Sequence, residues 1–315
     1  MSFFTRRRRS PALAVAALVG LAAVIFISGC VDNGAKPPKT SGYMVTVNSE
    51  GADASGGGNY EEGDVVTVTA GTAPDGKRFK NWTVISGGVS LDDSSIETAA
   101  FTMPANAVTV AAVFESTMFT DPRDVKTYRT TKIGVKVWMA QNLDFKTENG
   151  SWCYENNESN CDIYGRLYNW NTAMSGSTSS AKNPSGVQGV CPDGWHLPSR
   201  QEWGELAIAA GGTGTYGADT TGTAGTKLKA QSGWNDYKGN SGNGTDDFGF
   251  SALAGGYRDT TGSFLEFGIS NSWWTATENN SVAAFRRWVN YRVKYMSENA
   301  PTKAAAYQVR CVRDD

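Results

Sequence analysis

Four cysteines beyond residue 150 are the side chains whose chemistry the sequence constrains most: Cys153, Cys161, Cys191 and Cys311. An even number of cysteines in an exported chain favours disulfide bonds, and three pairings are open. We favour Cys153–Cys161, whose members lie close together in the chain, and Cys191–Cys311, which would fasten the C-terminal segment to the middle of the domain. No two of these cysteines have CxxC spacing, so a zinc site is not favoured.

His196 is the only histidine, which excludes a metal site built from several histidines. It stands between Trp195 and Leu197 in a segment that we expect to be buried, where a structural role is favoured over catalysis. The chain contains no GxSxG, HExxH, Walker or dinucleotide-binding motif. A carboxylate pair for glycoside hydrolysis stays open, because the separation of such a pair is set by the fold. We expect a protein without enzymatic activity, cofactor or bound metal.

The segment Ala284–Tyr295 alternates in a way that predicts a strand with one binding face. One face carries Phe285, Arg287 and Val289, whereas the other combines a tryptophan with basic and amide groups. Aromatic rings stack on sugar faces, and such a mixed surface suits a glycan or a protein ligand. The alternative is an ordinary strand with its tryptophan covered by a loop. The predicted ligand-binding residues are Trp273, Trp274, Arg286, Trp288, Asn290 and Arg292.

The polar segment Asn235–Asp247 contains five side chains with carboxylate or amide oxygens. Calcium takes about six to eight oxygen ligands, which a loop of this composition can supply. The alternative is a solvated, turn-rich loop without an ion, and this second interpretation is favoured here.

These residues must be positioned by the stretch Val190–Leu206. It begins with a short apolar segment, passes through a turn, and leads into a helix. Ser199 and Glu202 have the spacing of a capping box at the start of that helix. Asp124–Leu143 has the shape of a hairpin broken at Gly134. The C-terminal segment Ala306–Asp315 alternates like a single strand.

The first 29 residues resemble a bacterial lipoprotein signal peptide. Arg6–Arg9 form a positive region, Ala12–Ile27 is apolar, and Cys30 follows small residues. This pattern predicts diacylation of Cys30, with palmitate-type acyl chains as a membrane anchor. Val31 after the cysteine favours the outer membrane in Gram-negative bacteria, facing the periplasm or the outside. The alternative is an ordinary signal peptide or a membrane anchor, with an incidental cysteine. Residues 30–42 are expected to form a flexible tether.

Residues 43–115 are expected to form a small all-β module. The motifs GNYEEGDVVTVTA, FKNW and FTMPANAVTVAAVF resemble the divergent bacterial repeat domain related to internalin B-repeats. This resemblance implies a β-grasp-like spacer or stalk. Trp82 lies in an alternating segment and is expected to be a core residue.

Residues 119–315 carry six ordered motifs: IGVKVWMAQNL, YGRLYNW, CPDGWHLPS, DDFGFSALAGGYR, SWWTATE and VRCVRD. Together they resemble the Fibrobacter succinogenes major paralogous domain. The resemblance implies a C-type-lectin-like fold, also found in formylglycine-generating enzymes, of the α+β class with short strands and few helices. The cysteines that those enzymes use for oxidation chemistry are assigned here to disulfides, which argues against that activity.

Composition and charge exclude one class of partner. Without Arg6–Arg9 the chain has 25 Lys and Arg residues against 31 Asp and Glu residues, a net charge of −6. Nucleic-acid binding by phosphate neutralisation is therefore not expected. We expect a lipid-anchored protein whose head binds a glycan or a protein. The alternatives are a structural envelope protein and an enzyme that acts on polysaccharides or exported proteins.

Overall fold

The computed structural model describes residues 42–213 and 221–314. The predicted signal peptide, Cys30 and the tether up to residue 41 lie outside the described residues. Within the described ranges, no helix is long and apolar enough to span a lipid bilayer.

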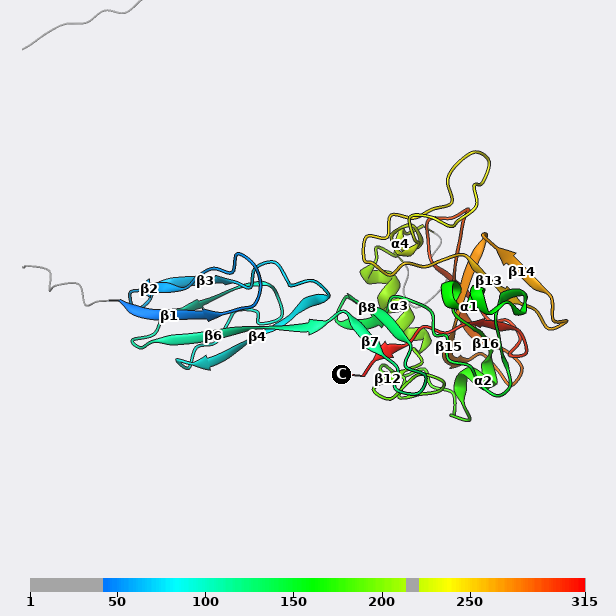
Figure 1. Cartoon of the computed structure of the whole chain (residues 1–315), viewed down its shortest axis with the longest axis horizontal. Helices are drawn as coiled ribbons and strands as arrows, with labels where there is room; N and C mark the ends of the chain where they lie inside the picture. Colours follow the sequence, from blue (N-terminus) through cyan, green and yellow to red (C-terminus); the bar gives the residue numbers. More distant parts are fainter. Residues whose placement is uncertain (1–41, 214–220, 315) are drawn as a thin grey trace, which may run out of the picture. The chain divides into compact units, whose positions relative to one another are not determined.

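The N-terminal module consists of six strands and contains no helix between residues 43 and 116, all of which the structure describes (Figure 1). The strands are β1 (Tyr43–Asn48), β2 (Gly58–Tyr60), β3 (Val65–Thr69), β4 (Lys77–Ser86), β5 (Thr98–Thr102) and β6 (Val108–Ser116). Four of them form a sheet in the order β2-β1-β6-β4, and β3 pairs with β5. The prediction of an all-β module is therefore confirmed.

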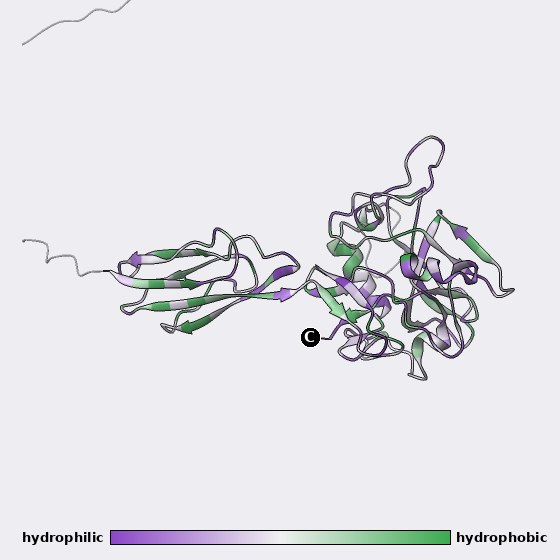
Figure 2. Cartoon of the chain, viewed as in Figure 1, coloured by the Kyte–Doolittle hydropathy of each residue, from purple (hydrophilic) through white to green (hydrophobic). Residues whose placement is uncertain are grey.

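The module has its own core because alternate residues of its strands point inward. Val66, Val68 and Phe101 are buried, and they pack in one cluster with Val110 and Trp82. Trp82 is only 3% exposed, as expected for a core residue. Figure 2 shows the resulting bands of hydrophobic and polar residues along the module's strands.

The C-terminal head is also strand-rich, with few and short helices, which confirms the predicted α+β class. Its helices are the 3-10 turn η1 (Tyr154–Asn156) and the α-helices α1 (Glu158–Tyr164), α2 (Trp170–Met174), α3 (Arg200–Ala209) and α4 (Ala224–Leu228). Its strands are β7 (Met118–Thr120), β8 (Thr127–Ile133), β9 (Lys136–Met139), β10 (Ser151–Trp152), β11 (Leu167–Asn169), β12 (Trp195–His196), β13 (Gly255–Arg258), β14 (Phe264–Phe267), β15 (Ser270–Glu278), β16 (Ala284–Asn290), β17 (Ser297–Asn299), β18 (Ala306–Gln308) and β19 (Val312–Arg313).

These strands form two sheets. Five of them follow the order β12-β19-β9-β8-β7, and the larger sheet runs β10-β11-β18-β15-β16-β17, with the β13–β14 hairpin joined to it through β18. The predicted hairpin is β8–β9, with Gly134 in a left-handed conformation at its turn (φ 62°).

The C-terminal segment differs from the single strand that its alternation predicts. It forms β18 in the larger sheet and β19 in the smaller one, so the chain passes from one sheet to the other between Gln308 and Val312. Arg310 and Cys311 lie in this crossover and are fully enclosed. Alternation of apolar residues records burial on one side of a segment, and it does not reveal which sheet supplies the partner strand.

Both favoured disulfides are present. Cys153 is bonded to Cys161, and Cys191 is bonded to Cys311. The second bond joins the crossover between β18 and β19 to the turn before β12, which itself pairs with β19. Helix α3 begins at the predicted capping box, in which Ser199 accepts a bond from the Glu202 amide and the Glu202 carboxylate accepts one from the Ser199 amide.

Three hydrophobic clusters form among the described residues of the head, and the two larger ones lie on opposite sides of β15. Trp274 belongs to the cluster that contains Tyr168 and Tyr307, and Trp273 belongs to the one that contains Trp203 and Phe250. Consecutive residues of a strand point to opposite faces, so β15 has a core on both sides. It is the central strand that holds β16 in place.

Candidate ligand-binding site

Strand β16 shows the alternation that its sequence predicts. Arg287 and Val289 are buried, whereas Arg286, Trp288 and Asn290 are partly exposed on the other face. In the antiparallel register with β15, Trp288 lies opposite Ser272 and Asn290 lies opposite Ser270. Directly opposed residues share a face of the sheet, so the two serines extend the face that β16 presents.

A hollow of about 160 Å³ opens on this face. The residues that line it are Glu266, Ser270, Ser272, Arg286, Trp288 and Asn290. Three of them are predicted binding residues. Glu266 comes from β14 and the serines come from β15. These three were not predicted from the sequence, because nothing local in their own segments shows which strand lies beside them.

The polar groups of the hollow are held by neighbours. Arg286 donates from Nη1 to Ser272 Oγ at 3.0 Å and from Nε to Asn299 Oδ1 at 2.9 Å. Its guanidinium carbon lies 4.3 Å from the ring centre of Tyr307. Ser270 donates to Glu266 Oε2 at 2.5 Å. Side chains fixed in this way lose little conformational freedom when a ligand binds.

Trp288 differs from almost every other tryptophan of the chain. Of the ten, eight are buried, and only Trp152 and Trp288 are partly exposed. Arg258 lies over the ring of Trp152, with its guanidinium carbon 4.4 Å from the ring centre. Trp288 lines the hollow and has Tyr295 at its edge, with ring centres 6.3 Å apart. It is therefore the tryptophan that a ligand in this hollow would meet.

Trp273 and Trp274 are not on this surface, and the prediction that they bind a ligand is wrong. Both are completely buried. Trp273 donates its indole N–H to Asn142 Oδ1 and Trp274 donates to the Tyr168 carbonyl, each at 2.7 Å. They face opposite ways into the two cores beside β15.

Arg292 lies beyond the end of β16 and lines a different hollow. Its backbone N–H donates to Asn290 Oδ1 at 2.9 Å. Its guanidinium carbon lies 4.9 Å from the ring centre of Tyr237 and 5.1 Å from that of Tyr291. The six predicted residues are therefore divided among one hollow, a neighbouring hollow and the core.

The loop considered for calcium uses its oxygens within its own surroundings. Asp246 accepts bonds from the Ser251 amide and hydroxyl, both at 2.7 Å, and Asn243 Oδ1 accepts one from the Trp234 amide at 3.1 Å. These contacts fit the favoured interpretation of a turn-rich loop.

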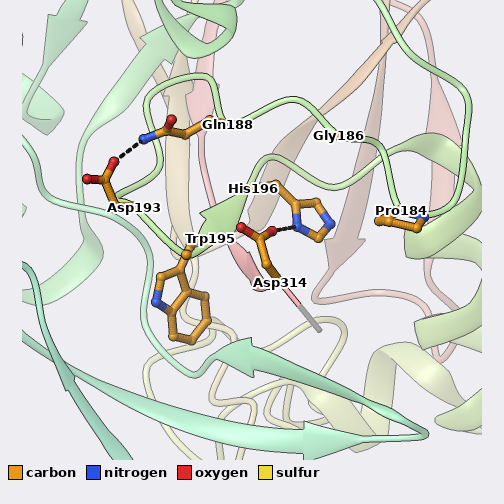
Figure 3. Close-up of a pocket in the computed structure, with 8 residues that line it drawn as sticks. Pro184, Gly186, Gln188, Asp193, Trp195, His196 and Asp314 are labelled. Carbon is orange, nitrogen blue, oxygen red and sulfur yellow. Dashed lines mark hydrogen bonds and ion pairs between the residues drawn. The ribbon is translucent and has the colours of Figure 1, made fainter.

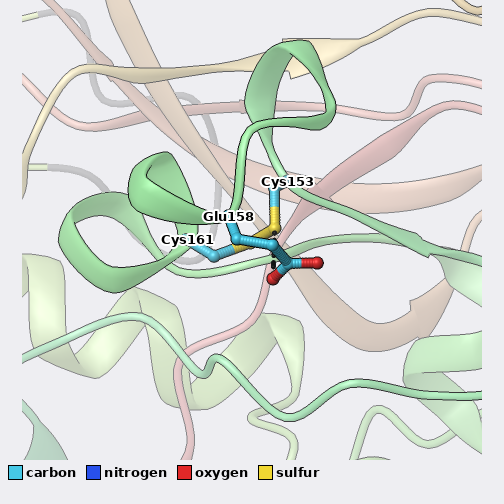
Figure 4. Close-up of side chains that lie close together, drawn as sticks. All are labelled: Cys153, Glu158 and Cys161. Atoms are coloured by element: carbon cyan, nitrogen blue, oxygen red, sulfur yellow. Dashed lines mark hydrogen bonds between the residues drawn. A yellow bond between two sulfur atoms is a disulfide. The ribbon is translucent and has the colours of Figure 1, made fainter.

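Cys153, Glu158 and Cys161 are the one group of at least three His, Cys, Asp or Glu side chains at metal-ligand spacing in the described ranges (Figure 4). The two sulfurs are joined in a disulfide, so neither is a thiolate that could bind a metal ion. The Glu158 carboxylate is exposed, pairs with Arg166, and has Cys153 Sγ 3.3 Å from its Oε2. The group is therefore a structural disulfide beside an ion pair.

His196 lies at a larger hollow, of about 590 Å³, between the 184–188 segment and the end of the chain (Figure 3). Its Nε2 is 2.8 Å from Glu202 Oε1 and its Nδ1 is 2.5 Å from Asp314 Oδ1. Figure 3 shows Asp314 directed at the imidazole, whereas Gln188 and Asp193 pair with each other elsewhere on the rim. Both ring nitrogens are occupied, which leaves none free to act on a substrate.

The two carboxylates also control the charge of this imidazole. Burial by itself lowers the pKa of His196, but the bonds and charges of Glu202 and Asp314 outweigh it and raise the pKa above its usual value. Burial raises the pKa of Glu202, but the bond and charge of His196, the Ser199 amide and the charge of Lys136 together outweigh burial and lower the pKa below its usual value. An imidazolium ion paired with two carboxylates is the favoured state, so His196 is a structural link between β12, α3 and the C-terminal segment.

Two family models match parts of this chain. Searches of curated proteins and of solved structures found no match to the chain. Residues 43–118 match the model of the divergent InlB B-repeat domain. Residues 131–313 match the model of the Fibrobacter succinogenes major domain. The two matches come in the predicted order, and because the second covers more than half of the chain, the protein belongs to the Fibrobacter succinogenes major domain family.

Proposed function

We propose that this protein is a non-catalytic, lipid-anchored binding protein whose head recognises a glycan through the exposed face of β16. The observation that carries the proposal is the partly exposed ring of Trp288 in a hollow otherwise lined by hydrogen-bonding groups. An indole ring packs on the C–H face of a sugar, and polar groups around it bind the hydroxyls.

The size and chemistry of the hollow fit one sugar ring better than a larger ligand. Its volume of about 160 Å³ is roughly half of the ~300 Å³ at which pockets for drug-sized molecules begin. Arg286 donates, Glu266 accepts, and Asn290 and the two serines can do both. A sugar presents alternating donors and acceptors that such a mixture satisfies, whereas a protein side chain of similar size seldom offers as many.

The order of the segments supports a role at the cell envelope. The leader and Cys30 resemble a lipoprotein signal, the module resembles a β-grasp-like stalk, and the head resembles a C-type-lectin-like domain. We propose attachment to the outer membrane through acyl chains on Cys30. Each buried CH₂ group contributes about 0.8 kcal/mol to membrane attachment, so several acyl chains hold the protein firmly.

The test uses residues 43–315, which form one compact unit, against a glycan array and insoluble cell-wall polysaccharides. We expect binding that Trp288→Ala weakens up to about tenfold, since an aromatic stacking contact contributes about 0.5–1.5 kcal/mol and ~1.4 kcal/mol corresponds to a factor of ten. Trp152→Ala is the matched control, because Trp152 is the other partly exposed tryptophan and lines no part of the hollow. Near-ultraviolet circular dichroism establishes that both variants keep the fold.

Equal losses in the two variants would show that the β16 face is not the binding site. Binding to a protein of the envelope, with no glycan bound, would make the head a protein receptor. If loss of the protein impaired envelope integrity and the Trp288→Ala variant restored it as well as the native chain does, the structural role would be favoured. Release of sugar products during incubation with the polysaccharides would favour the alternative that the protein is an enzyme.

A further inference from the structure

A second hollow, of about 400 Å³, lies beyond the end of β16. It is bounded by the end of α4, by the segment around Tyr237–Asn243 and by the chain from Tyr291 to Lys294. Lys229, Arg292 and Lys294 line it, and none of its described lining residues is Asp or Glu. This is a local excess of positive charge in a chain that is negative overall.

Lys229 is the unusual member of this set. Its side chain is 3% exposed, and its ammonium donates to the carbonyls of Gly242 at 2.6 Å and Asn290 at 3.2 Å. Among the described residues, no carboxylate forms an ion pair with it. Burial lowers its pKa to about 8, so it keeps its charge at neutral pH. A lysine ammonium has three N–H donors, of which two go to these carbonyls, and the ring centre of Trp234 lies 5.1 Å from the nitrogen.

The other two cations are exposed at the rim. The Tyr237 and Tyr291 rings, whose centres are 5.3 Å apart, hold the Arg292 guanidinium by cation–π contacts. No described acidic residue forms a salt bridge with Arg292 or Lys294. Lys229 is the buried cation of the three, and such a cation is normally paired with an anion, which the described residues do not supply.

Asn290 connects the second hollow with the first. It lines the Trp288 hollow, and its backbone carbonyl accepts a bond from Lys229, which lines the cationic hollow. The two hollows therefore flank one residue, and a ligand that spans Asn290 would contact both.

We infer that the cationic hollow binds the negatively charged group, carboxylate or sulfate, of an acidic saccharide whose neighbouring sugar occupies the Trp288 hollow. This inference rests on the proposed glycan-binding function. It narrows the ligand from glycans in general to acidic polysaccharides.

The first experiment compares tetragalacturonate with its carboxyl-reduced, neutral counterpart by calorimetry on residues 43–315. The acidic sugar should bind at least about fivefold more tightly, because hydrogen bonds to charged groups are stronger than those to neutral ones. Added salt should reduce that preference. A sulfated tetrasaccharide in a parallel titration distinguishes carboxylate from sulfate as the preferred group.

Exposed positions provide variants that keep the fold. Arg292→Gln and Lys294→Gln should each remove most of the preference for the acidic sugar and leave the neutral one unaffected. Lys132→Gln, which neutralises an exposed lysine on β8, should change nothing. Lys229→Met tests the buried ammonium directly. Trp288→Ala should lower the binding affinity for the acidic and the neutral sugar by the same factor.

Equal affinity for the acidic and neutral sugars, unchanged in the Arg292 and Lys294 variants, would overturn the inference and leave the proposed glycan binding intact. A titration with inorganic sulfate tests whether the anion site exists even if no sugar binds. The readout is the NMR chemical shifts of the backbone amides of Asn240, Asn243 and Val293. Shifts that disappear in Lys294→Gln would support the anion site even if no sugar bound, and only the proposed glycan function would then fail. If sulfate caused no shifts and the two sugars bound with equal affinity, the inference of an anion site would be rejected.

Discussion

Trp273, Trp274 and Trp288 are the same residue type on two paired strands, and their surroundings give them different roles. The first two have indole N–H groups bonded to buried acceptors and rings enclosed by the two cores. Trp288 has a core on only one side of its strand, and its ring borders a hollow. Residue type therefore identifies candidates for ligand contact. Because both faces of β15 are buried, Trp273 and Trp274 are excluded from these candidates.

His196 provides a test of charge at the residue scale. Because its pKa is raised in the folded protein, its ion pairs should stabilise the fold fully below the unfolded pKa of about 6.5. That stabilisation should be lost as the pH rises through the higher, folded pKa. We expect His196→Gln to lower the free energy of unfolding by about 2–3 kcal/mol at pH 6 and by less at pH 9.

Urea denaturation of residues 43–315 at both pH values measures this difference. Lys136 Nζ lies 3.2 Å from Glu202 Oε1, so we expect the buried carboxylate to keep one cation in the variant. Gln188→Ala, a neutral change on the rim of the same hollow, is the control and should show no pH-dependent effect. A loss of equal size at pH 6 and pH 9 would contradict an imidazolium in the folded state.

The helices and strands of the head are short. Disulfide bonds and ion pairs between them therefore contribute much to the stability of their arrangement. Strands β12 and β19 have two residues each and contribute few backbone hydrogen bonds to the smaller sheet. The Cys191–Cys311 disulfide and the His196 ion pairs join the same elements. Local sequence predicted the capping box of α3 and the hairpin β8–β9, since both depend on residues that are close in the chain.

The two disulfides should differ in their contribution to stability. Cys191 and Cys311 are 120 residues apart, and Cys153 and Cys161 are eight apart. A longer closed loop restricts the unfolded chain more. We expect Cys191→Ala with Cys311→Ala to lower the free energy of unfolding by about 4–5 kcal/mol, and Cys153→Ala with Cys161→Ala by about 2–3 kcal/mol. Guanidinium denaturation would measure both, and a larger loss for the short loop would contradict this account.

At the scale of the whole molecule, the proposed function depends on the order of three segments: the proposed leader, the module and the head. The module has its own core, and the head has three clusters of its own among the described residues. A lipid anchor on Cys30 would place the binding face at the envelope, where polysaccharides occur at high local density. Attachment through a membrane-bound anchor also allows many weak contacts to act together.

The anchor leads to a prediction for the full-length chain. Cys30→Ser should abolish incorporation of labelled palmitate and move the protein from the membrane fraction to the soluble fraction, because a serine hydroxyl cannot form the thioether. Cys30 lies far from the disulfide cysteines in the chain, so both disulfides should form normally. A Cys30→Ser protein that still sediments with the membrane would show that a different segment anchors it.

The sequence by itself determined the family, the order of the domains, the helix cap at Ser199 and the exposed face of β16. Each of these is recorded in residues that are adjacent or regularly spaced, so local patterns suffice to detect them. Only the tertiary structure decided that β15 lies between two cores, which buries Trp273 and Trp274. It also brought Glu266, Ser270 and Ser272 beside Trp288 and grouped Lys229 with Arg292. These juxtapositions depend on strand order and register, which are set by packing between distant segments.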